Sequence, residues 1–171
     1  MWPAALVEVS SSFQQKERVH ALRRLFTRAK VIDRRENPSN GYRAVHVVVT
    51  VLESAVELQV RTALQHRWAE WSEKFADEFG QDLKYGGGPE VWRNELLASS
   101  DGIAKYEACE MLYADIAADL KAFRSMGPAE FDDLKQQLVA RDEKMISTRD
   151  SVDQRLQRLV SRLELYRRDK Q

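Results

Sequence analysis

Alternating apolar and polar residues predict a β-hairpin near the middle of the chain. A first alternating run spans Gly41–Val51 and a second spans Ala55–Thr62, joined by the short segment Leu52–Ser54. Two such runs with a short connection are typical of neighbouring antiparallel strands. Because successive strand side chains point to opposite faces of a sheet, residues two apart share a face. We therefore expect one apolar face and one polar face on this hairpin.

The predicted polar face gathers five chemically different side chains. Tyr42 and His46 share a face of the first strand. Glu57, Gln59 and Arg61 share a face of the second strand. If both faces lie on the same side, an aromatic ring, an imidazole, a carboxylate, an amide and a guanidinium converge, which suits a nucleotide. From spacing alone, the alternatives are a core tyrosine, a hydrogen-bonded histidine and a solvated strand glutamate.

Helical periodicity predicts four helices around these strands. Serine residues before Phe13 and the hydroxyl of Thr62 supply N-caps, and Gly80 follows the end of the second helix. The apolar stripe of the second helix includes two tryptophans, which we expect to anchor that helix on the sheet. The predicted helices span Phe13–Phe26, Thr62–Phe79, Glu90–Met126 and Ala129–Arg168.

Two further apolar runs complete the predicted sheet. Ala5–Val9 predicts an edge strand and Ala29–Asp33 another strand, whereas Glu36–Gly41 contains Pro and Asn-Gly and predicts a loop. The elements then follow the order β-α-β-β-β-α-α-α, which favours an α+β fold. We expect a small mixed sheet packed by helices, with a long C-terminal helix.

The last predicted helix carries a narrow, heptad-like apolar seam that Arg141 and Thr148 interrupt. A stripe of this width suits a partner helix better than a broad core. The partner is Glu90–Met126 or a second copy of the chain, and because the interruptions weaken a continuous coiled coil, we favour a hairpin with Glu90–Met126 through Gly127-Pro128. Its outer half, beyond about Val152, is expected to remain free for another copy or a protein partner.

The composition is that of a folded domain. Of 171 residues, 43% are hydrophobic and 32% charged, and 27 basic residues balance 27 acidic ones. A net charge of zero disfavours non-specific nucleic-acid binding through bulk charge. Cys109 is the only cysteine, so no internal disulfide can form and we expect a reducing, cytoplasmic setting. No apolar run approaches the ~20 residues that span a bilayer, so we expect no membrane partner.

A cluster of basic residues leaves RNA open as a further partner. It extends from the end of the first predicted helix to the residues before the loop that precedes the hairpin. Guanidinium and ammonium groups bind phosphates, although a solvated helix face has a similar composition. The cluster consists of Arg23, Arg24, Arg28, Lys30, Arg34 and Arg35.

The hairpin motifs resemble one enzyme family. Gly41–His46, followed by Glu57–Thr62, is similar to the paired signature of the RelA/SpoT synthetase domain. Ala63–Glu70 and Leu83–Gly88 are similar to one branch of its single-domain members. The resemblance covers roughly Ser12–Glu110, and the order and spacing of the motifs make it specific. It implies a nucleotidyltransferase-like α+β fold.

The resemblance also implies a reaction. Members of that family transfer a pyrophosphate from ATP to the ribose 3′-hydroxyl of GDP or GTP, which makes the alarmone (p)ppGpp. We therefore expect GDP or GTP and ATP as substrates, with Mg²⁺ as the cofactor. Such a transfer needs a positioned acceptor, an activated hydroxyl and positive charge around the polyphosphate.

The resemblance assigns roles to individual residues. Glu57 matches the family's catalytic glutamate, which accepts the hydroxyl proton or holds the Mg²⁺ that lowers the pKa of that hydroxyl. Tyr42 matches the residue that stacks on the guanine of the acceptor. The remaining candidates for substrate binding are Asn40, Arg43, His46, Gln59, Arg61 and His66.

Two family features have no counterpart in the sequence. These are an upstream basic segment that clamps ATP and an Asp-x-x-Gly-x-Arg strand that binds Mg²⁺. We therefore expect residues 1–126 to be a truncated RelA/SpoT synthetase-like domain, either a fragment or a degenerate relative, and residues 127–171 to be a coiled-coil-like helix. Three functions stay open: a synthetase, a guanine-nucleotide-binding module without catalysis, and a toxin-like relative that modifies tRNA ends.

Overall fold

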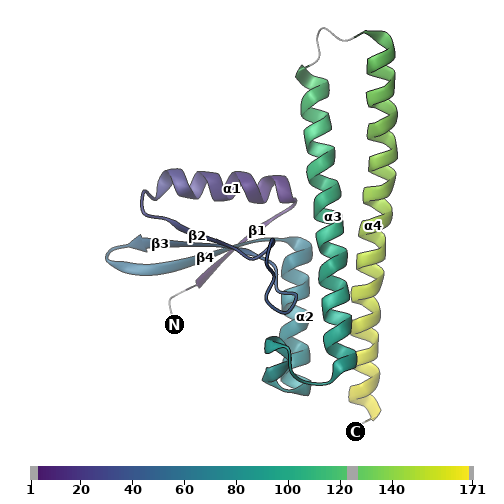
Figure 1. The fold of residues 1–171 in the computed structure, drawn as a ribbon. Helices are drawn as coiled ribbons and strands as arrows, with labels where there is room; N and C mark the ends of the chain where they lie inside the picture. Colours follow the sequence, from purple (N-terminus) through teal and green to yellow (C-terminus); the bar gives the residue numbers. More distant parts are fainter. Residues whose placement is uncertain (1–3, 123–126, 170–171) are drawn as a thin grey trace.

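The structure is a computed structural model that describes residues 4–122 and 127–169 (Figure 1). As the sequence predicts, the fold is α+β, with a small mixed sheet, packed helices and a long C-terminal helix. The predicted end of the third helix, residues 123–126, lies outside the described residues. The elements are β1 (Ala4–Val9), α1 (Ser12–Leu25), β2 (Lys30–Asp33), β3 (Val45–Val51), β4 (Ser54–Thr62), α2 (Ala63–Phe79), the 3₁₀ helix η1 (Gln81–Tyr85), α3 (Glu90–Ala122) and α4 (Pro128–Asp169).

The sheet has the strand order β1-β4-β3-β2. β1 runs parallel to β4, and the other neighbouring strands are antiparallel. The predicted hairpin is confirmed as β3 and β4. Leu52 and Glu53 join these strands with φ angles of 47° and 66°, as in the type I′ turn of a two-residue hairpin. The first hairpin strand is shorter than we expected, because it begins at Val45 and not at Gly41.

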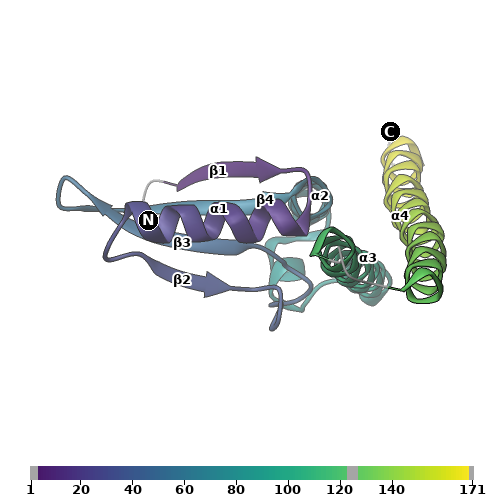
Figure 2. The ribbon, with the colours of Figure 1, turned by 90° about the horizontal axis from the view of Figure 1, so that it is seen from above.

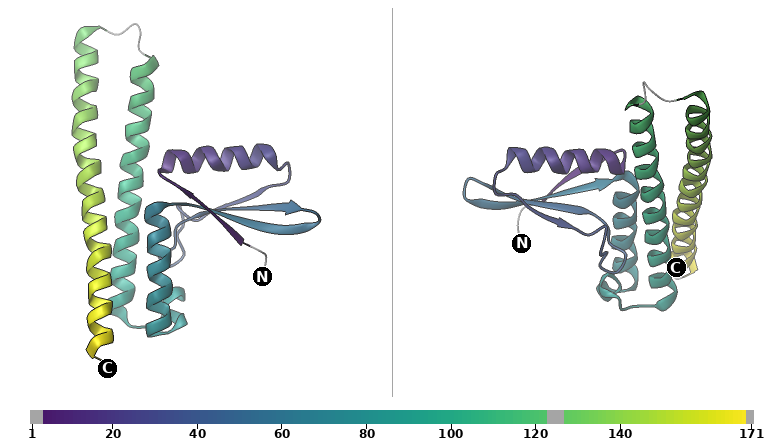
Figure 3. Two further views of the ribbon diagram at one scale, coloured as in Figure 1. Left: turned by 180° about the vertical axis from the view of Figure 1, so that it is seen from behind. Right: turned by 45° about the horizontal axis from the view of Figure 1, so that its top comes forward.

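One face of the sheet is buried under α1. Alternate residues of β3 and β4, including Val47 and Val60, form the buried face of the sheet. They pack against Val19 and Leu22 of α1 and against Phe26, which follows the end of that helix. Seen from above, α1 lies along the strands that it covers (Figure 2). No helix in the described part of the chain lies across the opposite face of the sheet, although α2 projects on that side from the end of β4 (Figures 1 and 3). That open face is the one to which the polar side of the hairpin points.

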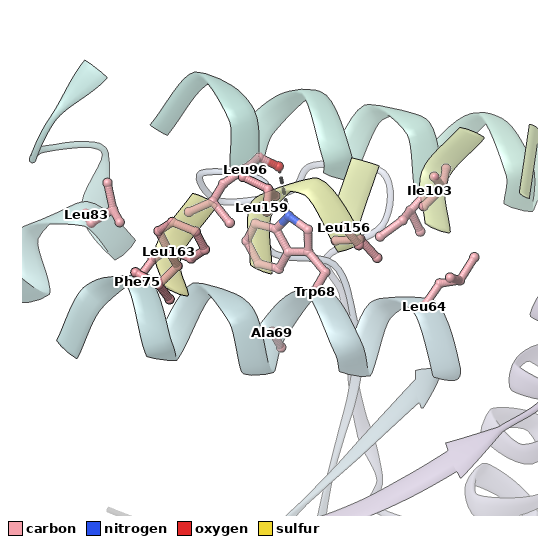
Figure 4. Packing of buried hydrophobic residues seen from close by; sticks show 11 residues of the cluster. Leu64, Trp68, Ala69, Phe75, Leu83, Leu96, Ile103, Leu156, Leu159 and Leu163 are labelled. Atoms are coloured by element: carbon pink, nitrogen blue, oxygen red, sulfur yellow. Dashed lines mark hydrogen bonds between the residues drawn. The ribbon is translucent and has the colours of Figure 1, made fainter. Parts of the chain in front are cut away.

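A second core forms where α2 meets the two long helices. Leu64, Trp68 and Phe75 of α2 are buried against α3 and α4 (Figure 4). The Trp68 indole N–H donates a 2.8 Å hydrogen bond to the carbonyl of Leu96 in α3. The expectation that the α2 tryptophans anchor the helix on the sheet is therefore wrong: Trp68 is buried in this helical core, and Trp71 packs against it.

The long helices α3 and α4 form an antiparallel hairpin, as the narrow apolar seam predicts (Figure 1). The expectation of a free outer half is wrong. Its apolar residues enter the core with α2, because the end of α4 runs back beside that helix. None of the helices within the described residues combines the length and apolarity of a membrane span. The buried seam residues are Val152, Leu156, Leu159 and Leu163.

Candidate functional site

The open face of the sheet carries the polar residues that the sequence predicts there. Strand alternation places Glu57, Gln59 and Arg61 of β4 on one face. The strand register sets His46 directly opposite Gln59, so the imidazole lies on the same face. On the other side of β4, Glu8 of β1 stands opposite Arg61. Three adjacent strands therefore contribute polar side chains to one surface.

Five side chains on this surface form a closed ring of hydrogen bonds. His46 Nδ1 lies 2.6 Å from Glu57 Oε1, and His46 Nε2 lies 3.1 Å from the Tyr42 hydroxyl. Gln59 Nε2 donates to Glu57 Oε1 at 2.9 Å, and Gln59 Oε1 accepts from Arg61 at 2.5 Å. Arg61 closes the ring by donating to the Tyr42 hydroxyl at 2.7 Å. The ring brings together all five hairpin residues predicted for the polar face.

The ring determines the direction of each proton. A guanidinium only donates, so the Tyr42 oxygen accepts from Arg61 and directs its own hydrogen to His46 Nε2. In a neutral imidazole the other nitrogen then carries the hydrogen. His46 Nδ1–H consequently donates to Glu57. These assignments follow from the donor and acceptor roles of the partners.

Glu57 is held as a carboxylate with one oxygen available. Its partial burial favours the neutral form, but hydrogen bonds from Gln59 and His46 and the charge of Arg61 outweigh burial and lower the pKa of Glu57 below its usual value. Both of those hydrogen bonds go to Oε1. Oε2 has no hydrogen-bond partner among the described residues. Glu57 therefore presents an ionised oxygen to the open face.

A cavity of about 420 Å³ adjoins this ring at Tyr42, His46 and Arg61, whereas Glu57 and Gln59 do not line it. The loop before β3 forms one wall, α2 a second and η1 a third. Arg61 lies over the Tyr42 ring, 5.1 Å from its centroid, and the Trp68 ring centroid is 6.5 Å from that of Tyr42. The volume is within the range of small-ligand sites. The lining residues are Arg34, Ser39, Asn40, Tyr42, His46, Arg61, Trp68, Ala69, Glu70, Ser72, Glu73, Lys84 and Tyr85.

A tight turn places Tyr42 at the cavity. Asn40 and Gly41 have positive φ angles of 51° and 85°. A Cβ on Gly41 would lie 2.9 Å from the Trp68 side chain, so the turn can pack against α2 only with glycine at this position. The Asn40 side chain donates to the carbonyl of Lys84 in η1 at 3.2 Å. This turn replaces the first residues of the strand that we expected.

Of the remaining candidates, Asn40 lines the cavity, whereas His66 and Arg43 do not. His66 lies on α2 with Nε2 3.8 Å from Glu70, which does line the cavity. Arg43 points away and forms a buried ion pair with Glu107 of α3 at 3.2 Å. Arg43 is thus separated from the other predicted binding residues, because its side chain points toward α3. The side chain of the preceding residue, Tyr42, lines the cavity.

Glu107 belongs to a buried polar network that sequence reasoning missed. It accepts hydrogen bonds from Gln65 at 2.5 Å and from Thr62 at 3.5 Å. Gln65 also accepts from Gln15 of α1, which donates in turn to the Val60 carbonyl. Burial raises the pKa of Glu107 above its usual value, although Arg43 and Gln65 act in the opposite direction. No local pattern around Glu107 distinguishes it from the other acidic residues of α3.

Sequence reasoning also missed part of the cavity wall. Glu70 and Glu73 follow His66 at helical spacing, so the period of α2 could have indicated them. Lys84 and Tyr85 reach the cavity only because η1 folds back after Gly80. This change of chain direction is part of the tertiary structure, so a local sequence pattern does not predict it.

The basic cluster is divided in the structure. Arg35 forms an ion pair with Asp33 at 2.5 Å, and Arg34 lines the cavity. Arg23 and Arg24 are exposed in the last turn of α1, which covers the opposite face of the sheet. These basic side chains therefore do not gather beside Glu57.

Glu57 is the residue of this ring that could hold a metal ion. Among the described residues, no three His, Cys, Asp or Glu side chains are arranged to hold a metal by themselves. Mg²⁺ is typically bound by one or two carboxylates together with water and substrate phosphates. Oε2 of Glu57 could supply one carboxylate ligand to such a site.

Comparison with known proteins identifies the region that carries this site. Residues 7–76 match the family described as "Region found in RelA / SpoT proteins". Uncharacterized proteins of Mycobacterium tuberculosis and Mycobacterium bovis are each 45% identical to this chain over 88 residues, which is 52% of this chain. The match spans only 30% of the length of those relatives. The crystal structure of the small alarmone synthetase 1 from Bacillus subtilis is similar over 70% of this chain and 63% of its own, with 18% identity and a TM-score of 0.48.

Proposed function

We propose that this chain, whose residues 7–76 form a RelA/SpoT-type region, binds a guanine nucleotide and transfers pyrophosphate to it from ATP. The observation that carries the proposal is the ring around Glu57. It holds an ionised carboxylate with a free oxygen, and three other members of the ring, Tyr42, His46 and Arg61, line a cavity of small-ligand size. The acceptor base lies in the cavity, and its ribose faces the ring.

Tyr42 positions the acceptor. Its ring lines the cavity, and it is held by hydrogen bonds to His46 and Arg61. An aromatic ring fixed in this way presents a flat apolar surface on which a purine stacks. A base held there directs the ribose toward the hairpin, where Glu57 is placed.

Glu57 activates the ribose 3′-hydroxyl. The hydroxyl proton passes to Oε2 while the 3′ oxygen attacks the β-phosphorus of ATP. A new P–O bond forms, the bond between the β-phosphorus and the α,β-bridging oxygen breaks, and AMP leaves with that oxygen. Gln59 and His46 occupy Oε1, so they direct the proton to the other oxygen of the carboxylate. If Oε2 of Glu57 held a Mg²⁺ instead of accepting the proton, that ion would lower the pKa of the hydroxyl and supply positive charge to the phosphates.

Cationic side chains around the cavity support the binding of phosphate. Arg34, Arg61 and Lys84 all line it. The Arg61 Nε is buried and has no hydrogen-bond partner in the described part of the chain. Guanidinium groups bind phosphate oxygens through two parallel N–H donors. These residues are suited to the polyphosphate of the acceptor.

The test separates binding from transfer. GDP and GTP are titrated calorimetrically into the purified protein, and product formation from labelled ATP is followed by thin-layer chromatography. Glu57→Gln is expected to keep guanine-nucleotide affinity and to lower transfer by about 100- to 10,000-fold, the usual contribution of a general base.

Glu53→Gln is the matched control, since Glu53 is an exposed glutamate in the turn of the same hairpin. Undiminished transfer by Glu57→Gln contradicts the role of Glu57. Binding without transfer by the parent protein supports a guanine-nucleotide-binding module instead. The absence of any guanine-nucleotide binding overturns the proposal.

A further inference from the structure

We propose that Glu70 reads the Watson–Crick edge of the bound base and selects guanine. The assignment rests on the proposed function, because it requires a purine stacked at Tyr42. Glu70 lies on the α2 wall of the cavity that Tyr42 also lines. It is thus a carboxylate beside the edge of a base held in that cavity.

The position of Glu70 on α2 is set by the packing of that helix. Ala69 is a buried member of the α2 cluster, and its side chain lies on the side of α2 that faces away from α3 (Figure 4). Both Ala69 and Glu70 line the cavity. The small Ala69 side chain leaves room for a base between the helix and Tyr42, and Glu70 flanks that space.

The carboxylate of Glu70 is available to a ligand. Its only close partner among the described residues is His66 Nε2 at 3.8 Å, which is beyond hydrogen-bond distance. The side chain is 55% exposed. Glu73, the other carboxylate in this wall, is instead engaged in an ion pair with Lys84. Glu70 is therefore the carboxylate whose acceptors remain free.

Guanine is the base that complements a free carboxylate. Its Watson–Crick edge presents two neighbouring donors, N1–H and the 2-amino group, and a carboxylate accepts two parallel hydrogen bonds. Adenine presents an acceptor at N1 and no amino group at C2, so a carboxylate gains no paired contact there. Glu70 consequently discriminates by hydrogen-bond pattern, while stacking on Tyr42 is indifferent to the base.

The same logic predicts a reversal of specificity. Xanthine carries a carbonyl where guanine has its 2-amino group, so its edge offers one donor and one acceptor. A glutamine amide presents one acceptor and one donor in the matching arrangement. Glu70→Gln should therefore bind xanthosine diphosphate better than the parent protein does, and GDP less well.

The experiment measures the affinities of GDP, inosine diphosphate, xanthosine diphosphate and ADP by calorimetry. The parent protein is expected to bind GDP most tightly. In Glu70→Gln, GDP affinity should fall by about 5- to 150-fold, the equivalent of a bidentate base contact. Xanthosine diphosphate affinity should rise over that of the parent. A gain for one nucleotide cannot come from a folding defect.

Two further variants test the assignment. Asp77→Asn makes the same change on the same helix outside the cavity and should leave all four affinities unchanged. Glu73→Gln should not shift the preference of the protein from GDP to xanthosine diphosphate. If Glu70→Gln keeps the parent's preference, or if Glu73→Gln reverses it, the assignment of Glu70 is overturned while the proposed function stands. If the parent binds no guanine nucleotide, both fall together.

Discussion

At the scale of single residues, the site depends on groups that restrain one another. Tyr42 has its hydroxyl tied to His46 and Arg61, and Arg61 also lies over its ring. Burial raises the pKa of Tyr42 above its usual value, so the phenol keeps its proton and can donate to His46. The ring of hydrogen bonds therefore orients the aromatic surface and the carboxylate together.

Two substitutions at Tyr42 separate stacking from orientation. Tyr42→Ala should weaken GDP binding by about 1–3 kcal/mol, because the stacking surface is lost. Tyr42→Phe should retain most of that affinity, because its ring is kept and only the hydrogen bonds to His46 and Arg61 are removed. Calorimetric titration with GDP measures both. Equal affinity for GDP in Tyr42→Ala and the parent would show that Tyr42 does not contact the bound nucleotide.

At the scale of elements, the start of α2 connects the hairpin to the long helices. Thr62 and Gln65 form a capping box, in which each side chain accepts from the backbone of the other. Gln65 also donates to Glu107 of α3, and Glu107 pairs with Arg43. Arg43, the residue that follows Tyr42, is thereby attached to α3. This buried network holds the cavity loop against the helical part of the molecule.

The Glu107 carboxyl should make stability depend on pH. Its pKa is raised in the folded protein, so between its ordinary value and that raised value the folded state binds more protons than the unfolded state. The contribution of this carboxyl to the free energy of unfolding is therefore greatest at low pH and declines as the pH rises through that window. Glu107→Gln removes this titration.

Urea unfolding of the parent and of Glu107→Gln at a series of pH values measures this effect. The stability of the parent relative to the variant should fall from acid toward neutral pH. Other titrating groups, including Asp33, whose pKa is lowered by Arg35 against the effect of burial, are common to both proteins and cancel in the difference. Parallel pH curves would show that Glu107 does not titrate differently on folding.

At the scale of the whole molecule, two cores meet at α2. The sheet and α1 form one, and α2, η1, α3 and α4 form the other. α2 follows β4 directly, so one of its faces builds the cavity wall and another faces the long helices (Figures 1 and 4). The C-terminal helix therefore supports the cavity through α2, although it contributes no residue to the cavity lining.

Two leucines of α4 test this architecture. Leu159 is 1% exposed in the helical core, so Leu159→Ala should lower the free energy of unfolding by about 2–5 kcal/mol. Leu165 on the same helix is 57% exposed, and Leu165→Ala should change stability by less than about 0.5 kcal/mol. Chemical denaturation of both variants gives the comparison. Equal effects would mean that the α4 seam is not buried as described.

The sequence by itself determined the features that depend on neighbouring residues. Strand alternation placed Glu57, Gln59 and Arg61 on one face, and the short connection predicted the hairpin. Thr62 and Gly80 marked the limits of α2, because caps act within one helical turn. These features are local, so a single stretch of chain carries all the information they need.

Only the tertiary structure decided which distant segments meet. The partner of Arg43 is Glu107, 64 residues away, and the α2 stripe faces α3 and α4 where the sequence suggested the sheet. Burial of the α4 seam and the approach of Lys84 to the cavity likewise depend on how the chain folds back. An apolar stripe specifies that a face is buried but not against what, because hydrophobic burial has no direction of its own.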